Sequence, residues 1–194
     1  MRPSRRAILT AIVCALLASV SPSARAQETA PATDAPRARV ETDKGAFVIR
    51  LRPDLAPAHV RHFIKVARAG GFDGTTFHRI VPRGIVQGGD PLSKDPKKAA
   101  LYGTGGLGLL KAEFSVEPMK RGAVAAVLRP SSRDSAGNQF FICLSDQPAL
   151  TGKFTIFGEV VSGMEAVDAI GATPVVGDKP QERVVIAHVV VEGR

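Results

Sequence analysis

The sequence is poor in cysteine and in aromatic residues. Its 194 residues include two cysteines, one tyrosine and no tryptophan, and only 5% are aromatic. Two cysteines are too few for the disulfide framework of a small secreted domain or for a cysteine-rich zinc site. The chain is instead 44% hydrophobic and 23% charged. This balance excludes wholesale disorder and predicts one packed domain.

The sequence also lacks an apolar run that would span a membrane comfortably. The N-terminal run Ala7–Val20 is uncharged but holds only 14 residues, whereas a membrane-spanning helix needs about 20. Three arginines precede this run, and an Ala-Arg-Ala sequence ends at Ala26. This pattern predicts that residues 1–26 are a signal peptide cleaved after Ala26, with an uncleaved anchor as the alternative. We therefore expect a periplasmic or secreted protein with no stable membrane insertion after cleavage.

Acidic residues are absent from the predicted signal peptide, so the overall charge of +8 is unevenly placed. Residues 1–26 hold four arginines, which leaves 22 basic and 18 acidic residues, a net charge of +4, in the remainder. A mildly basic body requires no nucleic-acid partner, and we expect none. Cleavage also removes Cys14. The remaining Cys143 lies in an apolar run and is predicted to be a buried small hydrophobe rather than a reactive thiol.

The body of the chain is rich in short apolar segments and has few helical patterns. Residues 27–38 are rich in alanine, proline and threonine and predict a flexible linker, followed by one domain over 39–194. A helix is expected from Pro57 to a stop at Gly70, and another over 163–170, where Ser162 and Glu165 form a capping-box pattern. The predicted strands are 39–42, 46–51, 76–81, 85–87, 122–128, 138–144, 155–161 and 184–192. Eight strands and two helices predict a mainly β fold, an eight-stranded closed antiparallel barrel.

A glycine-rich stretch over 103–108 fits the dinucleotide fingerprint G-x-G-x-x-G. That motif works when it joins a buried strand to a helix whose N-terminus meets the pyrophosphate. Here no strand pattern precedes it, no long amphipathic helix follows it, and no acid lies about 20 residues further on. A tight surface loop is therefore predicted, and a nucleotide-binding enzyme is the remote alternative.

The histidines show no pattern typical of metal or nucleophilic sites. His59 and His62 lie three residues apart on the first predicted helix, flanking its apolar stripe, and no third ligand is evident. We interpret both as solvated surface residues and expect no metal. His188 is predicted to point outward or to pair with a polar neighbour. No nucleophile elbow accompanies any histidine.

Two segments carry residues that a plain barrel does not need. Arg79 lies inside an apolar strand pattern, where a charge is rarely placed without a function. Its alternative is an arginine at the end of the barrel paired with a carboxylate. Phe140 and Phe141 are adjacent, so strand alternation sends one ring inward and the other outward. The outward ring would form a binding platform if one face of the barrel is a groove.

From about Arg39 to the C-terminus the chain resembles the cyclophilins, a family of peptidyl-prolyl cis-trans isomerases. The resemblance rests on five segments in order: Phe77–Arg79, Gln87–Asp90, Gly103–Gly106, Gln139–Ile142 and Leu150–Gly158. It implies an eight-stranded antiparallel barrel capped by two α-helices. It also implies an isomerase that needs no cofactor and whose partners are proline-containing segments of unfolded or partly folded proteins.

The resemblance assigns site residues position by position. Arg79 matches the catalytic arginine, Gln87 the glutamine that contacts the substrate backbone, and Phe141 the floor of the proline pocket. The implied substrate-binding residues are Phe77, His78, Ile85, Gln87, Val127, Leu128, Phe141, Leu150 and Phe154. Three positions depart from the family. Gly84 stands where a pocket phenylalanine is usual, Ala149 where many eukaryotic members have tryptophan, and Phe154 replaces a histidine. The pocket is therefore predicted to be shallower beside Gly84.

Two functions remain open at this point. The first is a peptidyl-prolyl cis-trans isomerase that accelerates rotation of X-Pro bonds in exported proteins during folding. The second is a peptide-binding or chaperone-like barrel module with weak or vestigial isomerase activity, motivated by the missing pocket aromatics. For either function we expect a monomer, because a closed barrel exposes no sheet edge to a second copy.

Overall fold

The computed structural model describes residues 35–193. The predicted signal peptide, its cleavage site and linker residues 27–34 lie outside the described residues. The first strand begins at Arg37, two residues before the predicted start of the domain. In the described part of the chain, no helix combines the length and the apolar character that crossing a bilayer requires.

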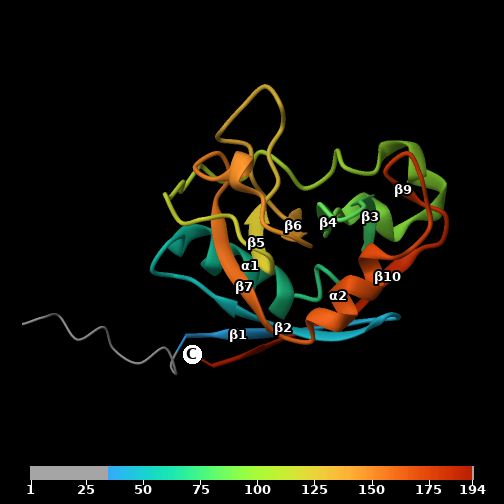
Figure 1. The fold of residues 1–194 in the computed structure, drawn as a ribbon, viewed down its shortest axis with the longest axis horizontal. Coiled ribbons are helices and arrows are strands. Elements are labelled where there is room, and N and C mark those ends of the chain that lie inside the picture. The colour runs from blue at the N-terminus through green and yellow to red at the C-terminus, as the bar shows by residue number, and fades with distance from the viewer. Residues whose placement is uncertain (1–34, 194) are drawn as a thin grey trace, which may run out of the picture. The chain divides into compact units, whose positions relative to one another are not determined.

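Eight strands close a barrel in which every neighbouring pair is antiparallel, as predicted (Figure 1). The order around the barrel is β1-β10-β3-β4-β6-β5-β7-β2. Their bounds are β1 (Arg37–Thr42), β2 (Gly45–Leu51), β3 (Thr76–Val81), β4 (Ile85–Gly88), β5 (Ala123–Ala126), β6 (Phe140–Cys143), β7 (Ile156–Ser162) and β10 (Val184–Glu192). Two further strands, β8 (Val175–Val176) and β9 (Lys179–Pro180), form a small separate ribbon. Segments of two residues are too short to produce a periodic pattern.

The two predicted α-helices are present, but the second begins differently. In α1 (Pro57–Arg68) the apolar face is buried against β10 and β7, and Gly70 follows in a left-handed conformation. Helix α2 (Met164–Gly171) has Gly163 as its N-cap, with a φ of 77° and no side-chain cap. The predicted capping box at Ser162 is therefore wrong. A Cβ on Gly163 would collide with the carbonyl of Ala46, so close packing against β2 determines this start. Three short 3-10 helices complete the fold: η1 (Pro91–Lys94), η2 (Pro96–Leu101) and η3 (Pro148–Leu150).

Phenylalanine rings fill the main core. The ring of Phe63 lies 4.9 Å from that of Phe72 and 5.4 Å from that of Phe157, while Phe140 packs edge-on against Phe77 at 6.0 Å. A second, smaller apolar cluster lies on the other face of the sheet. Its buried members are Met119, Ala123, Ala125, Phe141, Cys143 and Ile156. The sheet thus carries the main core on one face and a separate group of apolar side chains on the other.

Strand β6 confirms the expected division between the two adjacent phenylalanines. Phe140 belongs to the main core and Phe141 to the second cluster. Cys143 is fully buried in that cluster, and desolvation raises the pKa of its thiol to about 12. The thiol therefore stays protonated and behaves as the small hydrophobe predicted.

The prediction that His59 is a solvated surface residue is wrong. Its side chain is buried, with Nδ1 2.6 Å from an oxygen of Glu113. The same carboxylate accepts the backbone N–H groups of Ala58 and His59 at 3.0 Å. Glu113 therefore caps α1 from a loop that covers His59. His62 is half-buried and contacts the side chain of Asn138 at 2.8 Å. His188 pairs with a neighbouring carboxylate, as expected.

Candidate active site

A β-bulge in strand β3 decides where Arg79 points. Residues 77 and 79 would share one face of a regular strand. The pairing of β3 with β4 shifts register between these two residues, where Phe77 pairs with Gly88 and Arg79 with Gln87. Because the bulge changes the phase of the alternation, Phe77 and Ile80 both enter the core. Arg79 is left beside Gln87 on the outer face.

Arg79 lies on the rim of a cavity of about 340 Å³ on that outer face. The floor is apolar, because the rings of Phe141 and Phe154 meet edge to face at 5.3 Å. Residues from β3, β4, β6 and the loops after β5 and β6 converge on it. The lining residues are Arg79, Val81, Gly84, Ile85, Gln87, Val127, Leu128, Phe141, Gln147, Leu150 and Phe154. Seven of the nine predicted substrate-binding residues are among them.

The two remaining predicted residues lie elsewhere. The side chain of Phe77 is fully buried in the main core, and this residue borders the second cavity rather than the first. It supports the site by packing, since the bulge turns it inward. His78 also lies outside this cavity. It is buried beside Gln87 and lines a second cavity that also borders Arg79.

The Arg79 guanidinium is held by two partners. Nε donates to a carboxylate oxygen of Asp178 at 2.7 Å, and Nη1 donates to the amide oxygen of Gln87 at 3.4 Å. Arginine has five N–H donors, so three remain. Arg79 therefore has the carboxylate partner that the alternative predicted, and it also borders an apolar cavity. The hydrogen bond from Arg79 lowers the pKa of Asp178, which keeps this anchor charged at neutral pH.

The direction of every hydrogen bond behind Arg79 follows from the arginine itself. Because arginine only donates, the amide oxygen of Gln87 faces it, and the Gln87 amino group points inward. That amino group donates to Gln139 at 3.0 Å and makes a longer contact of 3.5 Å to Nε2 of His78. Gln139 then donates to the carbonyl of Gly105 at 2.7 Å. The chain of bonds fixes the orientation of Gln87 at the cavity rim.

His78 takes part in this series of hydrogen bonds as a neutral imidazole. Its Nε2 accepts from Gln87, so its proton lies on Nδ1, which faces the carbonyl of Thr76 at 3.4 Å. Burial lowers the pKa of His78, and the nearby charge of Asp90 offsets only part of this effect. The imidazole therefore stays neutral at pH 7 and can accept the bond that orients Gln87.

The glycine-rich loop is not a nucleotide site. The 3-10 helix η2 precedes it, and two of the loop's backbone N–H groups are already bound to a carboxylate. Those of Gly103 and Gly105 donate to the carboxylate of Asp90 at 2.5 and 3.2 Å. An anion that needs these donors would have to displace a buried carboxylate. The loop instead supports the site, because the carbonyl of Gly105 anchors Gln139.

Sequence reasoning missed three contributors to the site. Asp178 follows a turn glycine and has no periodic signal that would relate it to Arg79, 99 residues away. Val81 and Gln147 line the cavity but resemble ordinary strand and loop residues. Gly84 lines the cavity as well and contributes no side chain, and a Cβ at this position would lie 3.0 Å from Cγ1 of Val81. Ala149 is exposed and lies outside the cavity lining.

Over residues 35–193, no cluster of three or more histidine, cysteine, aspartate or glutamate side chains could hold a metal ion. The site itself places a fixed cation beside an apolar cavity. Such a cation can stabilise negative charge or a lone pair on a ligand whose apolar part fills the cavity.

The fold and the site together define a closed antiparallel β-barrel with a candidate ligand site on its outer face. Comparison with known proteins identifies the family. The model of the family described as "Cyclophilin type peptidyl-prolyl cis-trans isomerase/CLD" matches residues 37–191. The chain therefore belongs to this family, whose activity is peptidyl-prolyl cis-trans isomerisation.

Individual relatives agree with the family. A probable peptidyl-prolyl cis-trans isomerase of Brucella suis is 43% identical over 162 residues, which cover 80% of this chain and 82% of that protein. Peptidyl-prolyl cis-trans isomerase B of Streptomyces anulatus is 38% identical over 177 residues, 81% of this chain and 97% of that one. The crystal structure of a Cryptosporidium parvum cyclophilin type isomerase in the presence of the dipeptide Ala-Pro superposes with a TM-score of 0.73. It is 25% identical and covers 81% of this chain and 99% of that chain.

Proposed function

We propose that this isomerase accelerates X-Pro bond rotation in exported proteins as they fold, with Arg79 as its catalytic residue. The observation that supports this is the placement of one guanidinium, oriented by Asp178 and Gln87, at the rim of a cavity floored by Phe141. The cavity takes the prolyl ring, and Gln87 holds the adjoining backbone. Only the bond before proline is then left to rotate.

The chemistry follows from amide resonance. An X-Pro bond prefers trans by only about 0.5–1 kcal/mol, but rotation crosses a barrier of about 18–20 kcal/mol because the resonance is lost. In the twisted state the proline nitrogen regains a lone pair. A guanidinium N–H that donates to this lone pair stabilises the twisted amide and not the planar one, which is the difference that lowers a barrier.

The apolar floor contributes a second effect. The planar amide is more dipolar than the twisted amide, so removing water from around it destabilises the starting state more. Phe141, Phe154 and Leu150 exclude that water. A thousandfold acceleration requires about 4 kcal/mol, which one charge-assisted hydrogen bond and partial desolvation together can supply. The reaction needs no proton transfer and no cofactor.

Replacing Arg79 tests the proposal directly. Arg79→Ala is expected to lower kcat/KM for an Ala-Pro peptide tenfold or more, equivalent to at least about 1.4 kcal/mol of barrier. Arg79→Lys keeps the charge and loses the rigid fork, so it is expected to recover only part of the loss. Exchange NMR on the peptide measures both rates. Equal rates for wild type and Arg79→Ala would contradict the proposal.

The lack of a pocket phenylalanine at Gly84 favours one alternative, a peptide-binding module with weak isomerase activity. The same peptide distinguishes the two functions. A binding module would retain peptide affinity and show little acceleration even in the wild type. An isomerase would show acceleration that depends on Arg79, whether or not affinity changes.

Export is the second part of the proposal and rests on the N-terminal sequence. A signal peptide over residues 1–26 would place the enzyme in the periplasm or outside the cell. We expect the mature chain, isolated from the extracytoplasmic fraction, to begin at Gln27 by mass spectrometry. An intact chain that stays in the cytoplasm would contradict this part alone.

We also propose that the enzyme acts as a monomer on proline-containing segments. The closed barrel leaves no long strand edge for a second copy to extend. Light scattering in solution is expected to give the mass of one chain. A stable dimer mass would contradict it.

A further inference from the structure

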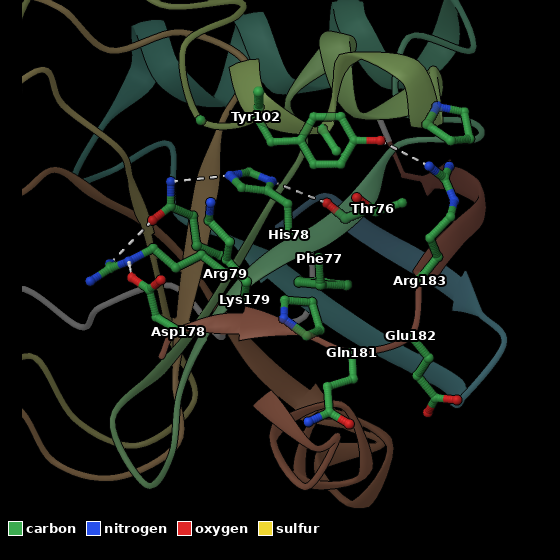
Figure 2. Close-up of a pocket in the computed structure, with 16 residues that line it drawn as sticks. Thr76, Phe77, His78, Arg79, Tyr102, Asp178, Lys179, Gln181, Glu182 and Arg183 are labelled. Atoms are coloured by element: carbon green, nitrogen blue, oxygen red, sulfur yellow. Dashed lines mark hydrogen bonds and ion pairs between the residues drawn. The ribbon is translucent and has the colours of Figure 1, made fainter. Parts of the chain in front are cut away.

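A second cavity, of about 400 Å³, also borders Arg79, and its lining residues are drawn in Figure 2. Arg79 and Gln87 line both cavities, so the two are joined at the catalytic arginine. The second cavity is bounded by β3, by η2 and by the segment 178–183. A peptide held in the first cavity therefore passes beside the second.

The barrel topology creates this cavity. Strand β10 pairs with β3 at only two positions, Val184 with Phe77 and Val185 with Thr76. The chain before Val184 consequently leaves the barrel, and it returns to β3 where Ile80 donates to the carbonyl of Asp178 at 2.8 Å. Between these two points the segment arches over His78, and η2 faces it across the opening.

The acidic side chains of the cavity are already neutralised. Asp178 pairs with Arg79 at 2.7 Å, and Glu182 pairs with Lys44 at 2.5 Å. Neither carboxylate is therefore available to a cationic ligand without loss of an existing ion pair.

Two basic side chains of the cavity are not neutralised. Among residues 35–193, neither Lys179 nor Arg183 forms an ion pair with a carboxylate. Arg183 is held in place by neutral acceptors, the hydroxyl of Tyr102 at 3.0 Å and the carbonyl of Ser93 at 3.1 Å. Figure 2 shows this arginine beside Tyr102, across the cavity from Arg79 and Asp178. The charge in the second cavity that no ion pair neutralises is therefore positive.

The walls between these charges suit the stem of a side chain. Pro96, Ala99 and Pro180 present apolar surface, and Tyr102 adds a ring. Two exposed lysines, Lys97 and Lys98, extend the positive charge along η2 at the edge of the cavity. The cavity thus combines apolar walls with uncompensated cations, which is the complement of an acidic side chain.

We propose that the second cavity is a subsite of the substrate and selects an acidic side chain, Asp or Glu, on the client segment near the isomerised proline. The carboxylate is bound by Arg183 beside Tyr102, and the aliphatic stem lies against the proline and alanine walls. Lys179, at the opposite end of the cavity, adds to the positive potential that attracts the carboxylate. This inference rests on the proposed function, because the client chain reaches the subsite only when its proline occupies the first cavity.

A peptide series tests the subsite. Each peptide carries one Ala-Pro bond and either Glu or the uncharged isostere Gln at one position, from four residues before the proline to four after it. Exchange NMR gives kcat/KM and chemical-shift titration gives Kd for each pair at low salt. We expect one position at which Glu is favoured over Gln about three- to fivefold, in line with partly exposed ion pairs. Raising the salt concentration should reduce this preference, because the charges are accessible to solvent.

Matched variants assign the preference to the cavity. Lys179→Gln and Arg183→Gln are each expected to bring the Glu-to-Gln ratio toward one. Lys65→Gln, which removes the same charge from an exposed position on α1, should leave the ratio unchanged. The proposal is overturned if no position favours Glu in either Kd or kcat/KM, or if Lys65→Gln lowers the ratio as much as Lys179→Gln.

Failure of the subsite differs from failure of the proposed function. A wild-type protein that accelerates Glu and Gln peptides alike is an isomerase without this subsite. A wild-type protein that accelerates no peptide contradicts the proposed function. In that case the Kd ratio still decides whether the cavity selects acidic side chains.

Discussion

At the scale of single residues, the orientation of Arg79, the proposed catalytic residue, is defined by what holds it. Asp178 binds the Nε edge of Arg79, and Gln87 accepts from Nη1. A flexible side chain with five donors could otherwise adopt many orientations. The carboxylate therefore orients the guanidinium and does not occupy all of its donors. We regard Asp178 as a positioning residue, because it acts through Arg79.

Replacing Asp178 should weaken catalysis through Arg79. Asp178→Ala is expected to lower kcat/KM about two- to fivefold and to change KM little, since a half-exposed ion pair contributes about 1 kcal/mol or less. The double variant with Arg79→Ala should be no slower than Arg79→Ala alone, because the two residues act as one unit. Additive losses in this double-mutant cycle would show that Asp178 acts independently.

His78 should make stability depend on pH in a defined direction. Burial lowers the pKa of this histidine in the folded state below the ordinary value of 6.5. Between the folded pKa and 6.5 the unfolded chain binds more protons, so the free energy of unfolding falls as the pH is lowered through this window. A protonated ring would also lose the bond it accepts from Gln87.

Comparison with His78→Gln isolates this contribution from the other histidines. Denaturant unfolding between pH 7.5 and pH 5, set by the ordinary histidine pKa of about 6.5, should show a larger loss for wild type than for the variant. NMR titration of His78 should give a midpoint below 6.5. A midpoint above it would contradict the assignment of a neutral ring.

At the scale of elements, single irregularities position the site. The bulge in β3 turns Phe77 inward and leaves Arg79 at the cavity rim. The left-handed Gly163 lets α2 begin directly against β2. In both places the backbone departs from a regular pattern because packing requires it. Substitutions at these positions should therefore lower the free energy of unfolding more than the change of residue type alone would.

Two glycines form a matched test of this point. Gly163→Ala combines an unfavourable positive φ with a collision against Ala46 and Phe47. Gly152→Ala has a similar positive φ but nothing within 4 Å. We expect Gly152→Ala to cost about 1 kcal/mol of unfolding free energy and Gly163→Ala to cost clearly more. Equal losses in denaturant unfolding would show that the collision is relieved at no cost.

At the scale of the whole molecule, the two faces of the barrel sheet differ in what their side chains do. Its inner face carries the phenylalanine core, and part of its outer face carries the smaller cluster that floors the first cavity. Both cavities border Arg79. Adjacent residues of β6 consequently serve different purposes.

The same substitution at two neighbouring positions should reveal this division. Phe140→Leu is expected to destabilise the fold by about 1–3 kcal/mol while leaving kcat/KM of the folded protein within about twofold. Phe141→Leu should cost less stability and lower kcat/KM about tenfold, because the floor under the prolyl ring is lost. Unfolding curves and peptide exchange rates on both variants measure the two effects. The reverse assignment would contradict the roles of the two faces.

Much of this arrangement was predictable from local patterns. Alternation in the eight apolar segments predicts the barrel strands, and it also divides Phe140 from Phe141. The matched motifs predict most residues of the first cavity. The resemblance placed Phe77 among the substrate-binding residues, but no local pattern predicts the bulge that turns its side chain into the core. The helical pattern left His59 in solvent, because Glu113, which covers this histidine, lies 54 residues away.

The sequence by itself determined which segments form strands, which side chains are apolar on each face, and which residue carries the positive charge at the site. These properties depend on neighbours a few residues apart. The tertiary structure alone decided that Asp178 holds Arg79, that the chain before β10 arches away from β3, and that a second cavity opens there. Closing the barrel brings segments about a hundred residues apart into contact, and no local pattern encodes which of their side chains meet.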